Sequence, residues 1–505
     1  MSEEAEKKGS TLPGAVEAPI EGAIENGFVS QADDTDLLAQ LGYKQELRRQ
    51  YSTTQVFAIA FSIMALLPSI ASTLSFSLPA GPVGMVWVGL CQLIFTIMGI
   101  LIQIREDCVR LTVSAEEFHT VTLALTQNPT DGFALMLLSL ISIARDGEWS
   151  ASRPVIYATY LATVVVHACM ATFMGRIMNR IQSVCIVLNV GLVIATVIAL
   201  PVGNKSNGLA INSGKYVFGH MENLTTWPTG WAFVLAWLSP IWTIGAFDSC
   251  VHMSEEATHA TRAVPIGIIL SIGLCGILGF LSLAVIAACM DTNLNNLIDS
   301  AFGQPMAQIY YDSLGKSGAL GFMAVVAIVQ FFMGLSILIA ASRQTWAFSR
   351  DGALPFSSFF RHVSKRIQYQ PVRTVWGVAF IAIVIGLLTL IDSAAANALF
   401  SLAVAGNDVA WGVPILCRLI WGDKTGKFRP GPFYTGVFSK PIAITAVVYL
   451  LFAIILCMFP TGGPDPTPDE MNYTIVINGA IWIGAALYYF LFARKWYTGP
   501  KTTTA

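Results

Sequence analysis

The residues best placed to do chemistry in this chain are polar side chains inside apolar stretches. Asp248 is the clearest example, because it follows Trp242-Thr-Ile-Gly-Ala-Phe in a run already interrupted by Pro240 and Gly245. An ionisable residue in the middle of a membrane helix costs about 2.5 to 3.5 kcal/mol on insertion scales, so its presence indicates function. A broken helix also frees backbone groups that can bind a solute. The competing interpretation is that Asp248 is a solvated cap at the inner mouth of the helix.

A second interruption lies near the start of the apolar part of the chain, within residues 64–73 (MALLPSIAST). Pro68 removes a helical hydrogen bond there, and small residues around it let a ligand approach the backbone. Two interrupted segments at corresponding places in two halves of a chain indicate an alternating-access binding site. A simple proline kink in a packed helix is the alternative, because membrane helices often contain proline.

Two further groups of polar residues have types and spacing that could do chemistry. Asn407 and Asp408 lie in an apolar stretch beside Gly406, which suggests a gating or coupling role. The set formed by His252, Glu255, Glu256 and His259 has helical spacing that resembles a metal site. Such sites need a second copy from another helix, which the remaining histidines do not supply, so a charged helix end is favoured. We therefore expect no metal, no cofactor and no catalytic residues.

The composition explains what must position these residues. The 505 residues are 54% hydrophobic and only 12% charged, with a formal net charge of −2, and the mean hydropathy is +0.63. Soluble proteins carry about 25% charged residues, and nucleic-acid-binding proteins need a basic excess. The chain is therefore predicted to be an all-α polytopic membrane protein that lies in a lipid bilayer and does not bind nucleic acid.

Apolar runs bounded by charged residues, proline or glycine predict about twelve transmembrane helices. The run at 131–144 has about two-thirds of the length needed to span a bilayer. The predicted spans are 55–78, 83–104, 131–144, 154–174, 181–203, 230–250, 264–290, 318–342, 373–391, 396–420, 440–460 and 474–493.

The distribution of basic residues predicts the orientation. Alternate loops on one side hold 22 of the 29 Lys and Arg residues, and those on the other side hold five. Basic loops stay in the cytoplasm, so both termini are expected there, which requires an even number of spans. Three Asn-x-Ser/Thr sequons, at Asn204, Asn223 and Asn472, fall in loops that this topology places outside.

Three regions are expected from the charge pattern. Residues 1–50 form an acidic cytoplasmic tail without a signal peptide, and their composition predicts disorder. Residues 51–495 form the transmembrane permease domain, and residues 496–505 form a cytoplasmic C-terminal tail.

Four segments together resemble one family, the amino acid/choline transporters of fungi, of the amino acid-polyamine-organocation superfamily. They are residues 245–265 (GAFDSCVHMSEEATHATRAVP), 61–71 (FSIMALLPSIA), 342–355 (SRQTWAFSRDGALP) and 428–433 (FRPGPF). The resemblance implies twelve spans with an inverted five-plus-five repeat, broken helices 1 and 6, and secondary transport driven by protons.

The resemblance also implies which residues contact the substrate. From the first break these are Ser69, Ile70, Ala71 and Ser72, and from the sixth span they are Trp242, Thr243, Gly245, Ala246, Phe247 and Asp248. Free amides at the first break would hold a carboxylate. Asp248 and the aromatic rings of Trp242 and Phe247 would hold an amine or a quaternary ammonium group.

The sequence departs from the family pattern between about 88 and 130. The family's Met-Ala-Glu-Leu end of the second span and its Pro-Thr-Ser-Gly-Gly-Leu-Tyr turn are missing, so residues 103–130 are atypical. Our hypothesis is a mis-joined exon or a shifted reading frame, which would leave the third span truncated.

Three functional hypotheses follow. The first is a permease that imports an amino acid or γ-aminobutyrate (GABA) with protons, and it is favoured over a choline or quaternary amine transporter. The second is a transport-defective product or a sensor, because of the altered segment. The third, an enzyme, has no nucleophile, base or metal motif to support it. The plasma membrane is the favoured location, ahead of the vacuole or another organelle.

Overall fold

The computed structural model describes residues 51–89, 129–175, 177–245, 247–367, 369–391, 393–422, 435–467 and 471–497. Within these ranges the regular structure is helical, apart from two isolated β-bridges. Several predicted features lie outside the described residues: the tail 1–50, most of the span 83–104, the atypical segment up to residue 128, Ala246, and the C-terminal residues 498–505.

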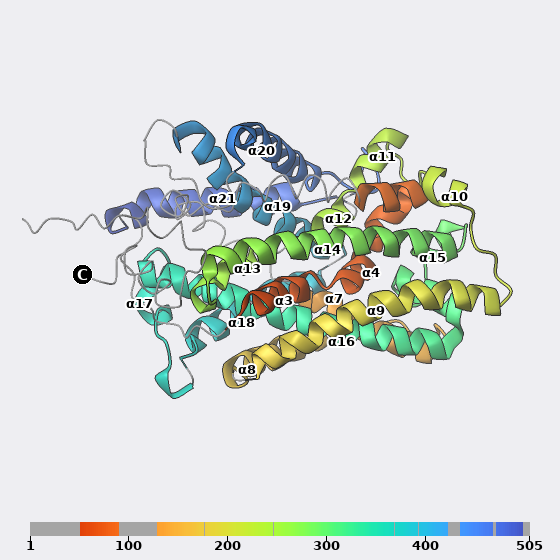
Figure 1. Cartoon of the computed structure of the whole chain (residues 1–505), viewed down its shortest axis with the longest axis horizontal. Helices are drawn as coiled ribbons and strands as arrows, with labels where there is room; N and C mark the ends of the chain where they lie inside the picture. The colour runs from red at the N-terminus through yellow and green to blue at the C-terminus, as the bar shows by residue number, and fades with distance from the viewer. Residues whose placement is uncertain are drawn as a thin grey trace, which may run out of the picture.

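The long helices run side by side along the length of the molecule (Figure 1), and short helices connect them. The helices that cross the bundle or form part of a crossing are α3 (Thr53–Met64), α4 (Leu66–Ser77), α7 (Pro129–Ala144), α8 (Arg153–Phe173), α9 (Met178–Ser206), α11 (Thr229–Leu235), α12 (Leu238–Thr243), α13 (Ser249–His252), α14 (Ala260–Cys289), α16 (Pro305–Asp351), α18 (Val372–Gly386), α19 (Ser393–Cys417), α20 (Ser439–Leu456) and α21 (Thr474–Leu491). The connecting elements are η1 (Leu78–Ala80), α10 (Gly214–Gly219), η3 (Ser254–Glu256), α15 (Leu294–Ile298), α17 (Ser357–Phe360), η4 (Lys365–Ile367), η5 (Leu387–Leu390), η6 (Arg418–Gly422), η7 (Gly436–Phe438) and η8 (Ala493–Lys495).

The all-α polytopic fold is confirmed. Nine helices in the described residues are long and apolar enough to cross a membrane, and they coincide with nine of the twelve predicted spans. The sixth predicted span is divided into α11, α12 and α13, so no single piece has the required length. The third predicted span is the 16-residue helix α7, and most of the second lies outside the described residues. The third and sixth spans are therefore missing from the nine for structural reasons, and the second because most of it lies outside the described residues.

The first span lies at the centre of the bundle, and the last lies at its edge. In the most apolar 18-residue window of the Thr53–Gly89 segment, 89% is buried, against 6% for Thr474–Lys495. Helices α14, α9 and α16 pack around α3, and α12 packs on α4. Because α3 carries apolar side chains on all faces, it suits a core position. Helix α21 therefore faces lipid, whereas α3 and α4 are surrounded by protein.

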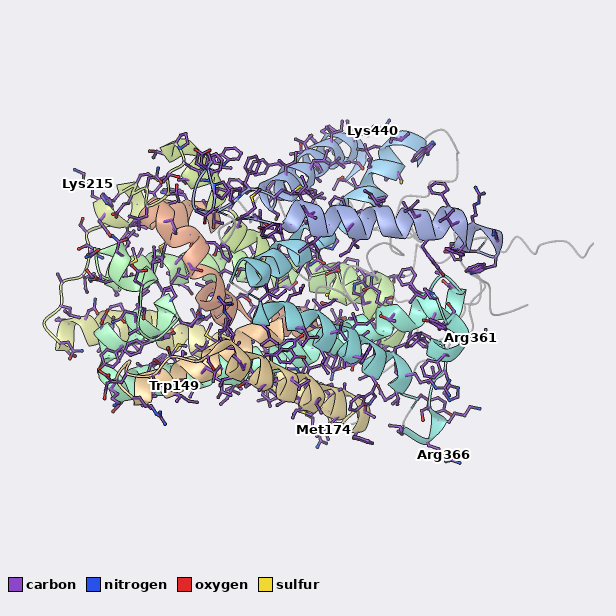
Figure 2. The ribbon with its side chains drawn as sticks, turned by 180° about the vertical axis from the view of Figure 1, so that it is seen from behind. Trp149, Met174, Lys215, Arg361, Arg366 and Lys440 are labelled. Atoms are coloured by element: carbon purple, nitrogen blue, oxygen red, sulfur yellow. The ribbon has the colours of Figure 1, made fainter. Side chains whose placement is uncertain are left out.

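Two exposed arginines mark one end of the bundle. Arg361 and Arg366 lie at one end, near α17, whereas Trp149 and Lys215 lie at the opposite end (Figures 1 and 2). We call the first of these the basic end. Tyr51, where the described chain begins, is tied to the segment after α13 by a hydrogen bond from its N–H to the Glu256 carbonyl, 3.0 Å.

Two of the sequon asparagines, Asn204 and Asn472, donate hydrogen bonds to backbone carbonyls elsewhere in the chain. The Asn204 side chain is buried and its Nδ2 donates to the Cys289 carbonyl over 2.9 Å. The Asn472 Nδ2 donates to the carbonyls of Cys457 and Phe459, over 2.8 and 2.9 Å. The buried Asn204 amide has no room for a sugar, so this sequon lends no support to the predicted outer loops.

Candidate functional site

The first span is broken at Ala65, between α3 and α4. Ala65 has φ 38° and ψ 64°, a left-handed conformation that costs about 1 kcal/mol or more for a residue with a Cβ atom. Pro68 lies in the first turn of α4, where the absence of an N–H is tolerated. The predicted interruption is therefore confirmed, and the helix breaks three residues before the proline.

The hydroxyl of Ser69 repairs the hydrogen bonding that the break removes. In an unbroken helix the N–H of residue 68 would donate to the Met64 carbonyl, but proline has no N–H. The Ser69 Oγ donates to the Met64 carbonyl instead, over 2.5 Å, in a buried position. The Ser69 N–H donates to the Ala65 carbonyl over 2.9 Å. One side chain thus stabilises the joint between the two halves of the span.

Replacing Ser69 with alanine is expected to lower the free energy of unfolding by about 1 to 3 kcal/mol, because the Met64 carbonyl is left buried without its donor. The matched change is Ser72→Ala. The Ser72 hydroxyl donates to the Pro68 carbonyl over 2.8 Å, but this carbonyl also accepts a helical N–H within α4, so the expected loss is below about 0.5 kcal/mol. Thermal unfolding of the purified protein in detergent measures the stability of both variants. Equal losses in Ser69→Ala and Ser72→Ala would contradict the role given to the Ser69 hydroxyl.

The sixth span is broken between α12 and α13. Helix α12 ends at Thr243, and α13 begins at Ser249 with Asp248 at its N-cap position. A Cβ atom on Gly245 would lie 3.0 Å from the Trp242 carbonyl oxygen, so the chain passes close to the end of α12 at this point. The Thr243 hydroxyl donates to the Ser239 carbonyl over 2.9 Å. The second predicted break is therefore also confirmed.

The two breaks face each other, because contacts on both sides of each break join the same two spans. On one side, the Thr73 and Ser239 hydroxyls are 2.9 Å apart. On the other side, the Cys250 Sγ lies 3.7 Å from the Val56 carbonyl oxygen. In the first span the interruption at Ala65 lies between Val56 and Thr73, and in the sixth the interruption after Thr243 lies between Ser239 and Cys250. The structure thus brings together the segments that the sequence predicted to meet.

Opposite partial charges meet at the breaks. The first amides of α4, on Leu66 and Leu67, have no partner inside the helix and carry the positive end of the helix dipole. The last carbonyls of α12 carry the negative end. A small solute with one anionic and one cationic group could therefore be bound by backbone groups alone.

The predicted contact residues are buried beside these helix ends. Ser69, Ile70 and Ala71 are buried and Ser72 is half-buried on α4, while Thr243 and Phe247 are buried at the second break. Trp242 and Gly245 are half-buried. The ring of Phe247 lies 4.3 Å from that of Trp411 on α19, measured between centroids. An aromatic pair from two different helices thus lies beside the break.

Asp248 has a partner in its own helix. Its Oδ2 lies 3.1 Å from the Nε2 of His252, one turn further along α13, and both side chains are largely buried. The carboxylate is therefore held at the start of α13 and is not a fully solvated cap. An amine at the break would have to share Asp248 with His252.

Asp408 is the more isolated carboxylate. Its side chain is only 2% exposed on α19, and its Oδ2 has no hydrogen-bond partner among the described residues. Trp411, which stacks on Phe247, lies three residues further along the same helix. Asn407 precedes Asp408 and is half-buried. The helix that carries Asp408 therefore also contacts the second break.

A buried hydrogen-bonded network around Arg343 was not predicted from the sequence. The Arg343 Nε donates to the Glu256 Oε1 over 3.1 Å, and the Arg343 Nη2 donates to the Gln370 Oε1 over 2.6 Å. Glu256 and Arg343 are 3% and 5% exposed. The sequence favoured a charged helix end over a metal site for this segment, but Glu256 is buried, and the described residues contain no group of three possible metal-ligating side chains. The actual partner of Glu256 is 87 positions away.

Comparison with known proteins gives a consistent result. The model of a family described as amino acid permease matches residues 120–481. The GABA-specific permease of Saccharomyces cerevisiae is 41% identical over 509 aligned residues, which cover 95% of this chain and 88% of the relative. Two uncharacterised amino-acid permeases of Schizosaccharomyces pombe are 31% and 30% identical, covering 96% and 95% of this chain and 91% and 92% of the relatives.

Proposed function

Since this chain belongs to the amino acid permease family, we propose that it imports GABA or a closely related amino acid together with protons. The family resemblance in the sequence and the broader assignment are confirmed: the chain is an integral multi-pass membrane protein that transports amino acids, and it is not an enzyme. The substrate, the coupling ion and the site residues belong to the proposal.

The observation that carries the proposal is the pair of facing breaks. GABA has a carboxylate at one end and an ammonium group at the other, separated by three methylene groups. The amides of Leu66 and Leu67 suit the carboxylate, and the carbonyls at the end of α12 suit the ammonium group. Phe247 and Trp411 offer aromatic surface to the methylene groups or to the cation.

We keep the substrate-binding residues proposed from the sequence, except that Ser69 and Ser72 receive a different role. Ser69 and Ser72 use their hydroxyls on the backbone of the first span, so we assign them to shaping the break. Ile70, Ala71, Trp242, Thr243 and Gly245 line or shape the segments around the site. The hydrogen-bonded pair of Asp248 and His252 provides a negative charge near the ammonium group. Asn407 and Asp408 are assigned to coupling.

Choline transport is the alternative substrate class. Choline has no carboxylate, so the amides at the start of α4 would bind no anion, and only the aromatic rings and carbonyls would be used. The facing helix ends therefore favour an amino acid. A transport-defective product or a sensor, suggested by residues 103–130, remains the second alternative, and that segment lies outside the described residues.

We further propose that the basic end faces the cytoplasm, because basic loops are retained there. Both termini then lie in the cytoplasm, with residues 1–50 as an acidic tail, residues 51–495 as the permease domain, and residues 496–505 as the C-terminal tail. The plasma membrane is the favoured location, ahead of the vacuole.

The test is uptake of labelled GABA by cells that express the full chain, at acidic and at neutral pH, with and without excess unlabelled choline. We expect uptake that increases at acidic pH and resists choline. Suppression by choline would move the assignment to a quaternary amine carrier. Absence of uptake, with the protein detected at the cell surface and GABA still bound, would support the sensor.

A further inference from the structure

A pocket of about 460 Å³ lies at the basic end, between the segment after α16 and the end of α21. One wall consists of Tyr488, Phe492 and Trp496, and the Tyr488 ring lies 6.1 Å from that of Phe492 and 6.5 Å from that of Trp496, measured between centroids. The Trp496 Nε1 donates to the Gly352 carbonyl over 3.3 Å and joins the two walls. The pocket is thus built from parts of the chain that are far apart in sequence.

The other wall carries groups that bind phosphate. Arg350 and Arg361 line it together with the hydroxyl-bearing residues Ser349, Ser357 and Ser358. The Arg350 guanidinium lies 5.0 Å from the centre of the Trp346 ring and 3.5 Å from the Asp351 carboxylate. These contacts fix its position and partly neutralise its charge. Arg361 is exposed at the same end of the molecule (Figure 2). Guanidinium groups next to hydroxyls are suited to a phosphate anion.

The aromatic wall belongs to the helix that faces lipid. Only 6% of the apolar window of Thr474–Lys495 is buried. Phe490, Leu491, Phe492 and Trp496 are exposed at the end of this helix, near α17 (Figure 1). Aromatic residues of this kind lie at the headgroup level of a bilayer. The pocket therefore joins a surface for acyl chains to a cationic wall, an arrangement that a soluble phosphate would not require.

We propose that this pocket binds the phosphate headgroup of an anionic phospholipid, with the acyl chains along the exposed face of α21. The proposal rests on the proposed orientation, which places the basic end in the cytoplasmic leaflet, where anionic lipids are concentrated. Arg361 supplies the main attraction, and the hydroxyl of the exposed Ser358 positions the phosphate, because the Ser349 and Ser357 hydroxyls donate to the Thr345 and Leu354 carbonyls.

The experiment is native mass spectrometry of the full chain in neutral detergent, titrated with phosphatidylserine and separately with phosphatidylcholine. We expect phosphatidylserine to bind more tightly than phosphatidylcholine, and Arg361→Gln to weaken its binding about fivefold. The matched control is Arg366→Gln, which removes the same charge from an exposed residue of η4 that does not line the pocket. Binding by Arg366→Gln is expected to stay within about twofold of the unmodified chain.

A second variant keeps the test independent of folding defects. Ser358→Asp places a negative charge at an exposed position on the pocket wall and is expected to weaken phosphatidylserine binding without lowering the thermal stability. Equal losses in Arg361→Gln and Arg366→Gln would overturn the proposal in favour of diffuse attraction. Equally tight binding of soluble glycerophosphoserine would overturn the lipid assignment. Because the assay measures no transport and needs no orientation, its failure is separable from failure of the proposed function.

Discussion

Changing Glu256 to glutamine is expected to lower the free energy of unfolding by about 3 to 5 kcal/mol, the largest stability effect that we predict. The substitution leaves the Arg343 guanidinium buried without the carboxylate that accepts from its Nε over 3.1 Å. Removing one partner of a buried pair is more costly than removing both. The double variant Glu256→Gln with Arg343→Gln should therefore recover most of the loss. Thermal unfolding of the purified protein in detergent measures each change.

The control for this prediction is an exposed ion pair in the same chain. The Lys316 Nζ lies 2.7 Å from the Asp146 Oδ2, with side chains that are 39% and 58% exposed. Asp146→Asn is expected to cost at most about 1 kcal/mol, because solvent screens exposed charges. Equal losses in Glu256→Gln and Asp146→Asn, or additive losses in the double variant, would mean that the buried pair is not coupled as described.

The second large effect concerns transport. Asp408→Asn is expected to abolish the increase of uptake at acidic pH and to reduce uptake there several-fold, while the purified protein stays folded. A carboxyl group inside a membrane bundle that gains and loses a proton as its surroundings change can couple proton movement to substrate movement. Asp408 is buried, and Trp411 on the same helix stacks on Phe247 at the second break. The measurement is the ratio of GABA uptake at acidic and at neutral pH.

Asp312→Asn is the matched control for Asp408→Asn. Asp312 is an exposed carboxylate whose Oδ1 accepts from the Gln308 Nε2 over 2.8 Å. Its loss should leave the uptake ratio unchanged. If Asp408→Asn retains full acid stimulation at normal surface expression, Asp408 is a packing residue and another group carries the proton.

The sequence predicted the two breaks because proline and glycine act locally. Pro68 cannot donate to Met64, and Gly245 tolerates a close approach to Trp242, so both interruptions follow from the residues themselves. The residue that adopts the left-handed conformation, Ala65, could not be predicted. Alanine avoids that conformation unless the surrounding packing requires it.

Ion pairs between residues far apart in the chain could not be predicted from the sequence, for a different reason. The sequence favoured a charged helix end for the segment with Glu256 and His259, whereas Glu256 is buried and paired with Arg343 from another helix. Nothing in a local pattern indicates which distant charge will neutralise a buried one.

The Ser69 hydroxyl also has a mechanical consequence. A backbone N–H is rigidly fixed to the helix that carries it, whereas a hydroxyl turns about a single bond and can follow its acceptor. The bond from Ser69 to Met64 can thus persist while the axes of α3 and α4 rotate relative to each other. The first span is thus joined so that α3 and α4 can change their angle without breaking this bond.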